Sequence, residues 1–323
     1  MNPDVAAAVD RLGRQGVLTP AQASLCGRVA GRELVSIRPE LRLLLYGGVL
    51  AVMGGVAVLV RQNLDRIGPV TIAAGLWMGA AAALLWTLHH APRFSWSQSS
   101  SPHLAFDYIL LLGALLTGAA LAYLEVQFTP LGRAWGHHLL AMSLFAAALA
   151  VRGDSRMVFS IALTTFAAWR GVSAALLERA FWSGSDATWS LRVNAVVTGL
   201  LFVGLGFGLV RSGRKAHFEP VAAHLGWLLV LVALLSGVAE RGSAGTSFRV
   251  VLFVVGAALA AAALARGRFP LFGMGLVAAY VGLSALVVTA VPDAFFGFVW
   301  FAGTGTAVLV GLLVAYRSTR RAW

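Results

Sequence analysis

The chain contains ten apolar segments in succession, most of them close to twenty residues long and separated by short polar stretches. A helix needs roughly 20 apolar residues to cross about 30 Å of hydrocarbon. In lipid a helix also satisfies its own backbone N–H and C=O groups, which water cannot do there. The sequence therefore predicts an all-α integral membrane protein of about ten transmembrane helices. The predicted spans are residues 42–60, 69–88, 105–124, 136–151, 156–176, 192–210, 220–239, 248–265, 269–291 and 294–316.

The composition agrees with a bilayer as the solvent. Apolar residues make up 59% of the chain and charged residues 12%, whereas a soluble domain has roughly 45–50% and about 25%. A soluble fold of this length would need more polar surface to cover its core. Lipid removes that need, because leucine, valine and phenylalanine can face it directly.

The net charge of +12 does not indicate nucleic-acid binding. Of the 25 basic residues, 24 are arginine, and they occur singly, in twos or in threes between apolar segments rather than in one basic stripe. The single cysteine, Cys26, permits neither an intramolecular disulfide nor a cysteine metal cluster. We expect no cofactor and no nucleic-acid partner, and we expect the lipid bilayer as the main partner.

The orientation follows from the basic residues in the loops. With the N-terminus in the cytoplasm, 17 basic residues lie in cytoplasmic segments and 7 lie on the opposite side, while Arg170 falls within a span. Cytoplasmic loops of membrane proteins carry the excess of lysine and arginine. The sequence therefore predicts a multi-pass protein of the bacterial inner membrane with both termini in the cytoplasm.

Residues 1–41 precede the first span and predict a short cytoplasmic helical hairpin, with residues 42–323 as the polytopic membrane domain. Residues 3–14 have apolar positions at helical spacing. Thr19 and Gln22 are spaced as a capping box, and Pro20 suits the first helical position. The hairpin is too small for a strong core, so we expect it to contact the membrane surface or a protein partner.

The first ninety residues resemble a bacterial membrane-protein family catalogued as domain of unknown function 2157. Three features carry the resemblance: residues 12–23 (LGRQGVLTPAQA), the glycine pairs Gly47-Gly48 and Gly54-Gly55, and residues 62–67 (QNLDRI). Leu64 stands where the family has tryptophan. The resemblance implies a multispanning membrane protein and brings no catalytic residue to this chain.

Small residues recur at four-residue spacing in three spans. Such stripes let helix backbones approach closely in lipid. We expect them to pack helices within the chain, and a homodimer face or a moving hinge is the alternative. The stripes are Gly47, Ala51 and Gly55, then Gly204 and Gly208, then Gly303, Ala307 and Gly311.

Arg170 is the basic residue that the topology leaves at membrane depth, roughly 21 Å along the fifth span. An unpaired arginine there is costly, so a carboxylate or a water-filled cavity is expected beside it. Glu125, His137 and Glu178 lie at compatible depth and complete a candidate intramembrane polar cluster. The alternative is that Arg170 extends to the membrane surface. Asn194 and His224 are expected to form hydrogen bonds between helices.

The sequence contains no motif of a serine hydrolase, a zinc protease or a phosphate-binding loop. It favours a non-enzymatic membrane protein that acts as a scaffold or accessory subunit through its N-terminal hairpin. A secondary transporter built from five plus five helices is the alternative, because an odd repeat inverts the second copy. An enzyme acting on lipid would need the cluster around Glu125, His137 and Arg170.

Overall fold

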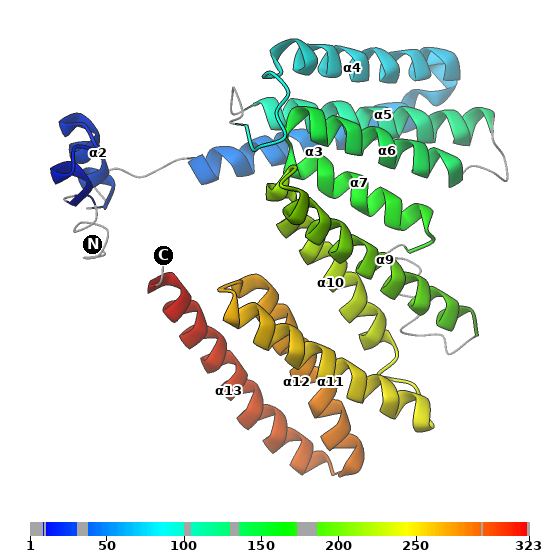
Figure 1. The fold of residues 1–323 in the computed structure, drawn as a ribbon. Helices are drawn as coiled ribbons and strands as arrows, with labels where there is room; N and C mark the ends of the chain where they lie inside the picture. Colours follow the sequence, from blue (N-terminus) through cyan, green and yellow to red (C-terminus); the bar gives the residue numbers. More distant parts are fainter. Residues whose placement is uncertain are drawn as a thin grey trace. The chain divides into compact units, whose positions relative to one another are not determined.

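The computed structural model describes residues 9, 11–30, 38–99, 105–129, 136–172, 186–291 and 293–321. All regular secondary structure within these ranges is helical, and seven of their helices are long and apolar enough to cross a membrane (Figure 1). The predicted class, an all-helical membrane protein, is confirmed. The chain divides into two compact units, Met1–Leu64 and Asp65–Trp323.

The first unit contains α2 (Pro20–Ala30) and most of α3 (Arg38–Ile67). The predicted capping box begins α2, since the Thr19 N–H donates to Gln22 Oε1 at 2.9 Å and the Gln22 N–H donates to Thr19 Oγ1 at 3.3 Å. Before it, Gly16 has φ +71°, and its N–H donates to the Gly13 carbonyl. The glycine therefore ends the preceding helical turn, as a left-handed residue does at a helix C-terminus. The hairpin and the domain boundary after residue 41 stay predictions.

The second unit is a series of antiparallel helix pairs. The pairs α4–α5, α6–α7, α9–α10 and α11–α12 pack most extensively, and α13 lies against α12. Contacts between successive pairs are much fewer. The helices are α4 (Pro69–His90), α5 (Phe106–Phe128), α6 (Gly136–Gly153), α7 (Arg156–Trp169), α9 (Asp186–Ser212), the 3-10 turn η2 (Ala216–Phe218), α10 (Glu219–Ser236), α11 (Gly242–Ala265), α12 (Phe269–Ala290) and α13 (Ala294–Arg321).

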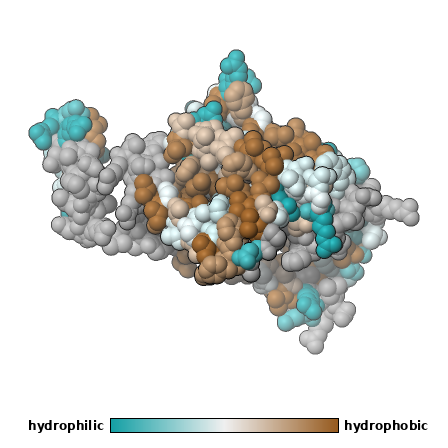
Figure 2. All heavy atoms as spheres, turned by 90° about the horizontal axis from the view of Figure 1, so that it is seen from below, coloured by the Kyte–Doolittle hydropathy of each residue, from teal (hydrophilic) through white to brown (hydrophobic). Residues whose placement is uncertain are grey.

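Large apolar side chains remain exposed along these helices, as lipid-facing residues do. Phe295 and Phe298 of α13 are 77% and 72% exposed. Figure 2 shows apolar residues over much of one face of the molecule. The buried apolar core of the second unit includes Leu231 of α10, Leu252 and Leu259 of α11 and Ala278 of α12. The helices therefore bury one side against neighbours and present the other to hydrocarbon.

The fifth predicted span, residues 156–176, is a shorter helix than expected. Helix α7 has 14 residues and a length of about 21 Å, short of the hydrocarbon thickness. Gly171 has φ +78°, and the N–H groups of Gly171 and Val172 donate to the carbonyls of Ala168 and Ala167. This is the Schellman pattern that ends a helix at glycine. Arg170 is thus the C-cap of α7 rather than a residue within a continuous span.

Close helix contacts use glycines other than those of the predicted stripes. A Cβ on Gly199 of α9 would lie 2.5 Å from the Gly226 carbonyl oxygen of α10, and a Cβ on Gly226 would lie 2.6 Å from that of Gly199. In α11 and α12, Gly256 and Gly275 approach each other in the same way. No atom lies within 4 Å of a Cβ built on the predicted glycines of α3, α9 or α13, which are Gly47, Gly55, Gly204, Gly208, Gly303 and Gly311. Packing within the chain is therefore absent at these positions, and the two alanines of the stripes, Ala51 and Ala307, are exposed.

Candidate functional site

Three loops of the second unit meet at a buried ion pair. They are residues 91–99 after α4, residues 154–155 between α6 and α7, and residues 213–218 between α9 and α10. Because the helices alternate in direction, these loops lie at the same end of the bundle (Figure 1). The turn between α11 and α12 also lies at this end. We call this end the arginine-rich face.

Asp154 is the centre of this site. Its Oδ1 accepts from Lys215 Nζ at 2.8 Å, and its Oδ2 accepts from the Ser99 N–H at 2.5 Å and from Ser99 Oγ at 2.9 Å. The Asp154 side chain is 4% exposed and that of Lys215 is 2% exposed. One carboxylate thus joins three loops that belong to three different helix pairs.

The backbone of the second loop explains how Asp154 reaches this position. The Ser155 N–H donates to the Ala150 carbonyl, which ends α6, and Ser155 Oγ accepts from the Val158 N–H to begin α7. A Cβ on Gly153 would lie 2.5 Å from Leu110 Cδ2 of α5, so only glycine fits there. The tight turn leaves Asp154 with φ +58° and its side chain directed at the other two loops.

Both members of the ion pair have left-handed backbone. Lys215 has φ +49°, and only one other non-glycine residue in the described ranges, Thr129, has positive φ. This conformation costs roughly 1–2 kcal/mol for a residue with a Cβ. The Lys215 N–H donates to the Trp96 carbonyl at 2.7 Å, and its Nζ lies 5.5 Å from the centre of the Phe94 ring. The contacts of both residues therefore hold a backbone geometry that neither favours alone.

The electrostatics of Asp154 favour its charged form. Burial alone raises the pKa of this carboxyl, but the hydrogen bonds from Lys215 and Ser99 and the nearby His217 ring outweigh burial and lower the pKa below its ordinary value. His217 Nε2 lies 2.7 Å from Asp154 Oδ1, outside hydrogen-bond geometry. The Phe218 ring beside it stacks on Phe159 with centres 4.7 Å apart. Aromatic rings thus shield the ion pair from water.

Exposed arginines surround this site. Each has an exposed side chain and no carboxylate within ion-pair distance in the described part of the chain. On the same face, Glu219 pairs with Arg268, and Asp154 pairs with Lys215. The remaining positive charge is therefore not neutralised within the described structure. These residues are Arg93, Arg156, Arg211, Arg214 and Arg266.

A second charged cluster lies at the opposite end of the bundle. Arg192 of α9 is 5% exposed and donates to Ser236 Oγ at 3.0 Å, to the Ser236 carbonyl at 2.9 Å and to Glu240 Oε1 at 2.8 Å. Its guanidinium also lies 5.3 Å from the centre of the Phe248 ring of α11. This cluster joins the pair α9–α10 to α11, as the Asp154 site joins the pairs before it.

The predicted polar cluster is only partly brought together. Glu125 Oε2 lies 2.9 Å from His138 Nε2, whereas the adjacent His137 is exposed. Arg170 has a buried Nε without a hydrogen-bond partner, and no ion pair joins it to a carboxylate in the described ranges. Glu178 lies outside the described residues. The cluster as a whole stays a prediction.

Of the two predicted interhelical residues, one makes its bond. The Asn194 side-chain amide of α9 donates to the Arg170 carbonyl at the end of α7, so its prediction is confirmed. His224 instead contacts the Pro220 carbonyl of its own helix. Sequence analysis missed the Asp154 site, although Lys215 is the single lysine of the chain. Its charge fitted the pattern of residues that flank a span, and nothing in the local sequence indicated burial.

Comparison of the chain with models of known protein families, with curated proteins and with solved structures found no match in any of the three.

Proposed function

We propose that the chain is a non-enzymatic multi-pass membrane protein that acts as a scaffold or accessory subunit, and that its arginine-rich face binds an acidic surface of a protein partner. One observation carries the proposal. The Asp154–Lys215 ion pair fixes three loops while Arg93, Arg156 and Arg211 beside it stay exposed and unpaired in the described structure. The charges are therefore presented from fixed loops.

The energetics of binding favour such an arrangement. Ordering a flexible loop at an interface costs free energy, and loops that are already fixed avoid most of that cost. A cluster of like charges also attracts a partner of opposite charge and discriminates against others. The arginine-rich face therefore suits an acidic protein surface, and residues 1–41 provide a second region for partner contact.

The proposal includes a topology of about ten spans in the bacterial inner membrane, with both termini in the cytoplasm. Each of the ten apolar segments overlaps one helix, and the basic residues divide 17 to 7 between the two sides. The arginine-rich face is then cytoplasmic. Membership of the family that the first ninety residues resemble is part of the same proposal.

Affinity purification from cross-linked native membranes tests this function. The variant Arg93→Glu/Arg211→Glu should lose the proteins that wild type retains, and high salt should weaken retention by wild type. The control Arg61→Glu/Arg241→Glu reverses two exposed charges assigned to the other side of the membrane. Equal retention by both double variants, or no specific protein with any of them, contradicts the proposal.

A secondary transporter is the second candidate, favoured by the end of α7. The helix stops after 14 residues at Gly171, and the adjacent Arg170 has a buried, unpartnered Nε. Discontinuous helices with free polar groups form substrate sites in carriers. Thermal unfolding with a panel of small anions separates the two functions. A scaffold is not stabilised by a solute, whereas a carrier is stabilised by its substrate and loses this effect in Arg170→Ala.

A further inference from the structure

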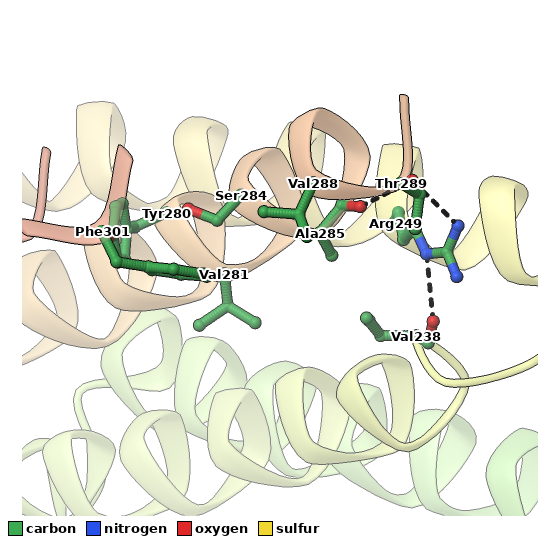
Figure 3. A pocket seen from close by; sticks show the side chains of 9 residues that line it. All are labelled: Val238, Arg249, Tyr280, Val281, Ser284, Ala285, Val288, Thr289 and Phe301. Carbon is green, nitrogen blue, oxygen red and sulfur yellow. Dashed lines mark hydrogen bonds between the residues drawn. The ribbon is translucent and has the colours of Figure 1, made fainter. Parts of the chain in front are cut away.

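A small pocket opens at the end of the bundle opposite the arginine-rich face. Its volume is about 250 Å³, and it lies between α11, α12, the beginning of α13 and Val238 after α10 (Figure 3). The side chains of Val281, Val288 and Phe301 form an apolar wall. Arg249 lies at one end of the pocket, beside Thr289. The pocket thus combines an apolar channel with one cation.

Arg249 retains its positive charge without a carboxylate partner in the described structure. Its Nε donates to the Val238 carbonyl at 3.0 Å, Nη1 to Thr289 Oγ1 at 3.3 Å and Nη2 to the Glu240 carbonyl at 3.4 Å. All three acceptors are uncharged, and the Glu240 carboxylate is paired with Arg192 at 2.8 Å. A guanidinium has five N–H groups, so two remain for a ligand.

The depth of the pocket corresponds to the border between lipid headgroups and acyl chains. Arg249 lies seven residues after Gly242, the first residue of α11, which is about 10 Å along the helix. Thr289 is the next-to-last residue of α12. A cation near two helix ends, with an apolar channel leading from it towards the membrane centre, matches the polarity of a single phospholipid.

We propose that this pocket binds an anionic phospholipid, with its phosphate at Arg249 and one acyl chain along Val281, Val288 and Phe301. Arginine is suited to phosphate because its N–H groups bind two oxygens at once. Pockets that enclose a whole small ligand measure roughly 300–1,000 Å³. A smaller pocket therefore fits part of a lipid whose remainder stays in the bilayer. This site is independent of the partner-binding face and concerns the opposite leaflet.

Native mass spectrometry of the purified full chain, after incubation with vesicles of phosphatidylglycerol or of phosphatidylcholine, tests the proposal. Wild type should retain one more phosphatidylglycerol than Arg249→Gln, with an affinity for that molecule about ten-fold or more above that of the variant. Arg241→Gln is the matched control, because Arg241 is an exposed residue at the start of the same helix. It should retain lipid as wild type does.

A second variant separates lipid binding from the role of Arg249 in holding the loop. Ala285 lines the pocket, and Ala285→Phe should fill it without removing the cation. It should lose the same phosphatidylglycerol molecule while its helical content and unfolding temperature stay close to those of wild type. Equal retention of the two lipids by wild type, or full retention by Arg249→Gln and Ala285→Phe, overturns the proposal.

Discussion

Replacing Lys215 by methionine tests whether the buried ion pair holds the loops together. Methionine has a similar length and no charge, and the substitution leaves the left-handed backbone of residue 215 in place. Asp154 would then be buried with one fewer donor, although both hydrogen bonds from Ser99 remain. Breaking a buried pair by removing one partner costs roughly 3–5 kcal/mol.

The remaining contacts place the expected loss within that range. The cation–π contact with Phe94 is also lost and contributes about 0.5–1 kcal/mol. The main-chain bond from residue 215 to the Trp96 carbonyl persists, as do the bonds from Ser99. We therefore expect Lys215→Met to lower the free energy of unfolding by about 3–4 kcal/mol.

Unfolding in detergent micelles, followed by circular dichroism during denaturant titration, measures this loss. Arg214→Met is the matched control, since Arg214 is the exposed neighbour of Lys215 and contacts only the Trp96 ring in the described structure. It should cost less than about 1 kcal/mol. The double variant Asp154→Asn/Lys215→Met removes both charges and keeps a residue that tolerates left-handed backbone.

A double-mutant cycle decides the interpretation. The double variant should be more stable than Lys215→Met alone, because the unpaired buried charge is gone. If Lys215→Met unfolds within about 0.5 kcal/mol of wild type, or if the single effects add, the ion pair does not hold the loops. The proposed presentation of fixed arginines would then lose its physical basis.

Three further predictions concern other parts of the chain. Asp154 has a lowered pKa, so its contribution to stability should be constant above about pH 4 and be lost as the pH falls through the lower folded value; unfolding midpoints between about pH 6 and pH 2.5 should show this loss in wild type and not in Asp154→Asn. Gly226→Ala should separate α9 from α10 and cost about 1–3 kcal/mol of unfolding free energy, whereas Gly204→Ala, with nothing within 4 Å, should be neutral or slightly stabilising. Thr19→Ala should destabilise the start of α2 by about 1 kcal/mol, measured as faster amide hydrogen exchange in its first turn, and Ser24→Ala should leave those amides unchanged.

The membrane class could be predicted because it depends on composition and on apolar length, which a sequence contains directly. The capping box at Thr19 could also be predicted, because it is a local pattern of three residues. The end of α7 at Gly171 was missed for a related reason. Glycine after an arginine is a local stop signal, but the apolar residues that follow it continued the pattern of a span.

The packing faces could not be predicted from the glycine spacing. A helix that is apolar all round has no moment to show which side faces a neighbour. Gly204 and Gly208 have the spacing of a packing motif, yet α9 meets α10 through Gly199 and Gly206, seven residues apart on another side of the helix. Which stripe is used depends on the position of α10, and that is a tertiary property.

The Asp154 site was beyond sequence analysis for the same reason. Asp154 and Lys215 are 61 residues apart, and each lies in a short loop where a charge normally faces water. Their approach needs the antiparallel order of six helices, which places both loops at one end. The positive φ of each residue follows from this approach and leaves no mark on the local sequence.

The two charged clusters have a common physical role in this fold. Lipid provides no hydrophobic driving force between helices, so close packing and polar bonds must join them. Close glycine contacts hold α9 to α10 and α11 to α12, but contacts between successive pairs are sparse. Asp154 joins the loops of three pairs at one end, and Arg192 joins α9 and α10 to the residues before α11 at the other. Packing therefore stabilises each helix pair, while buried charges at the helix ends, where desolvation costs less than at the membrane centre, fix the pairs to one another.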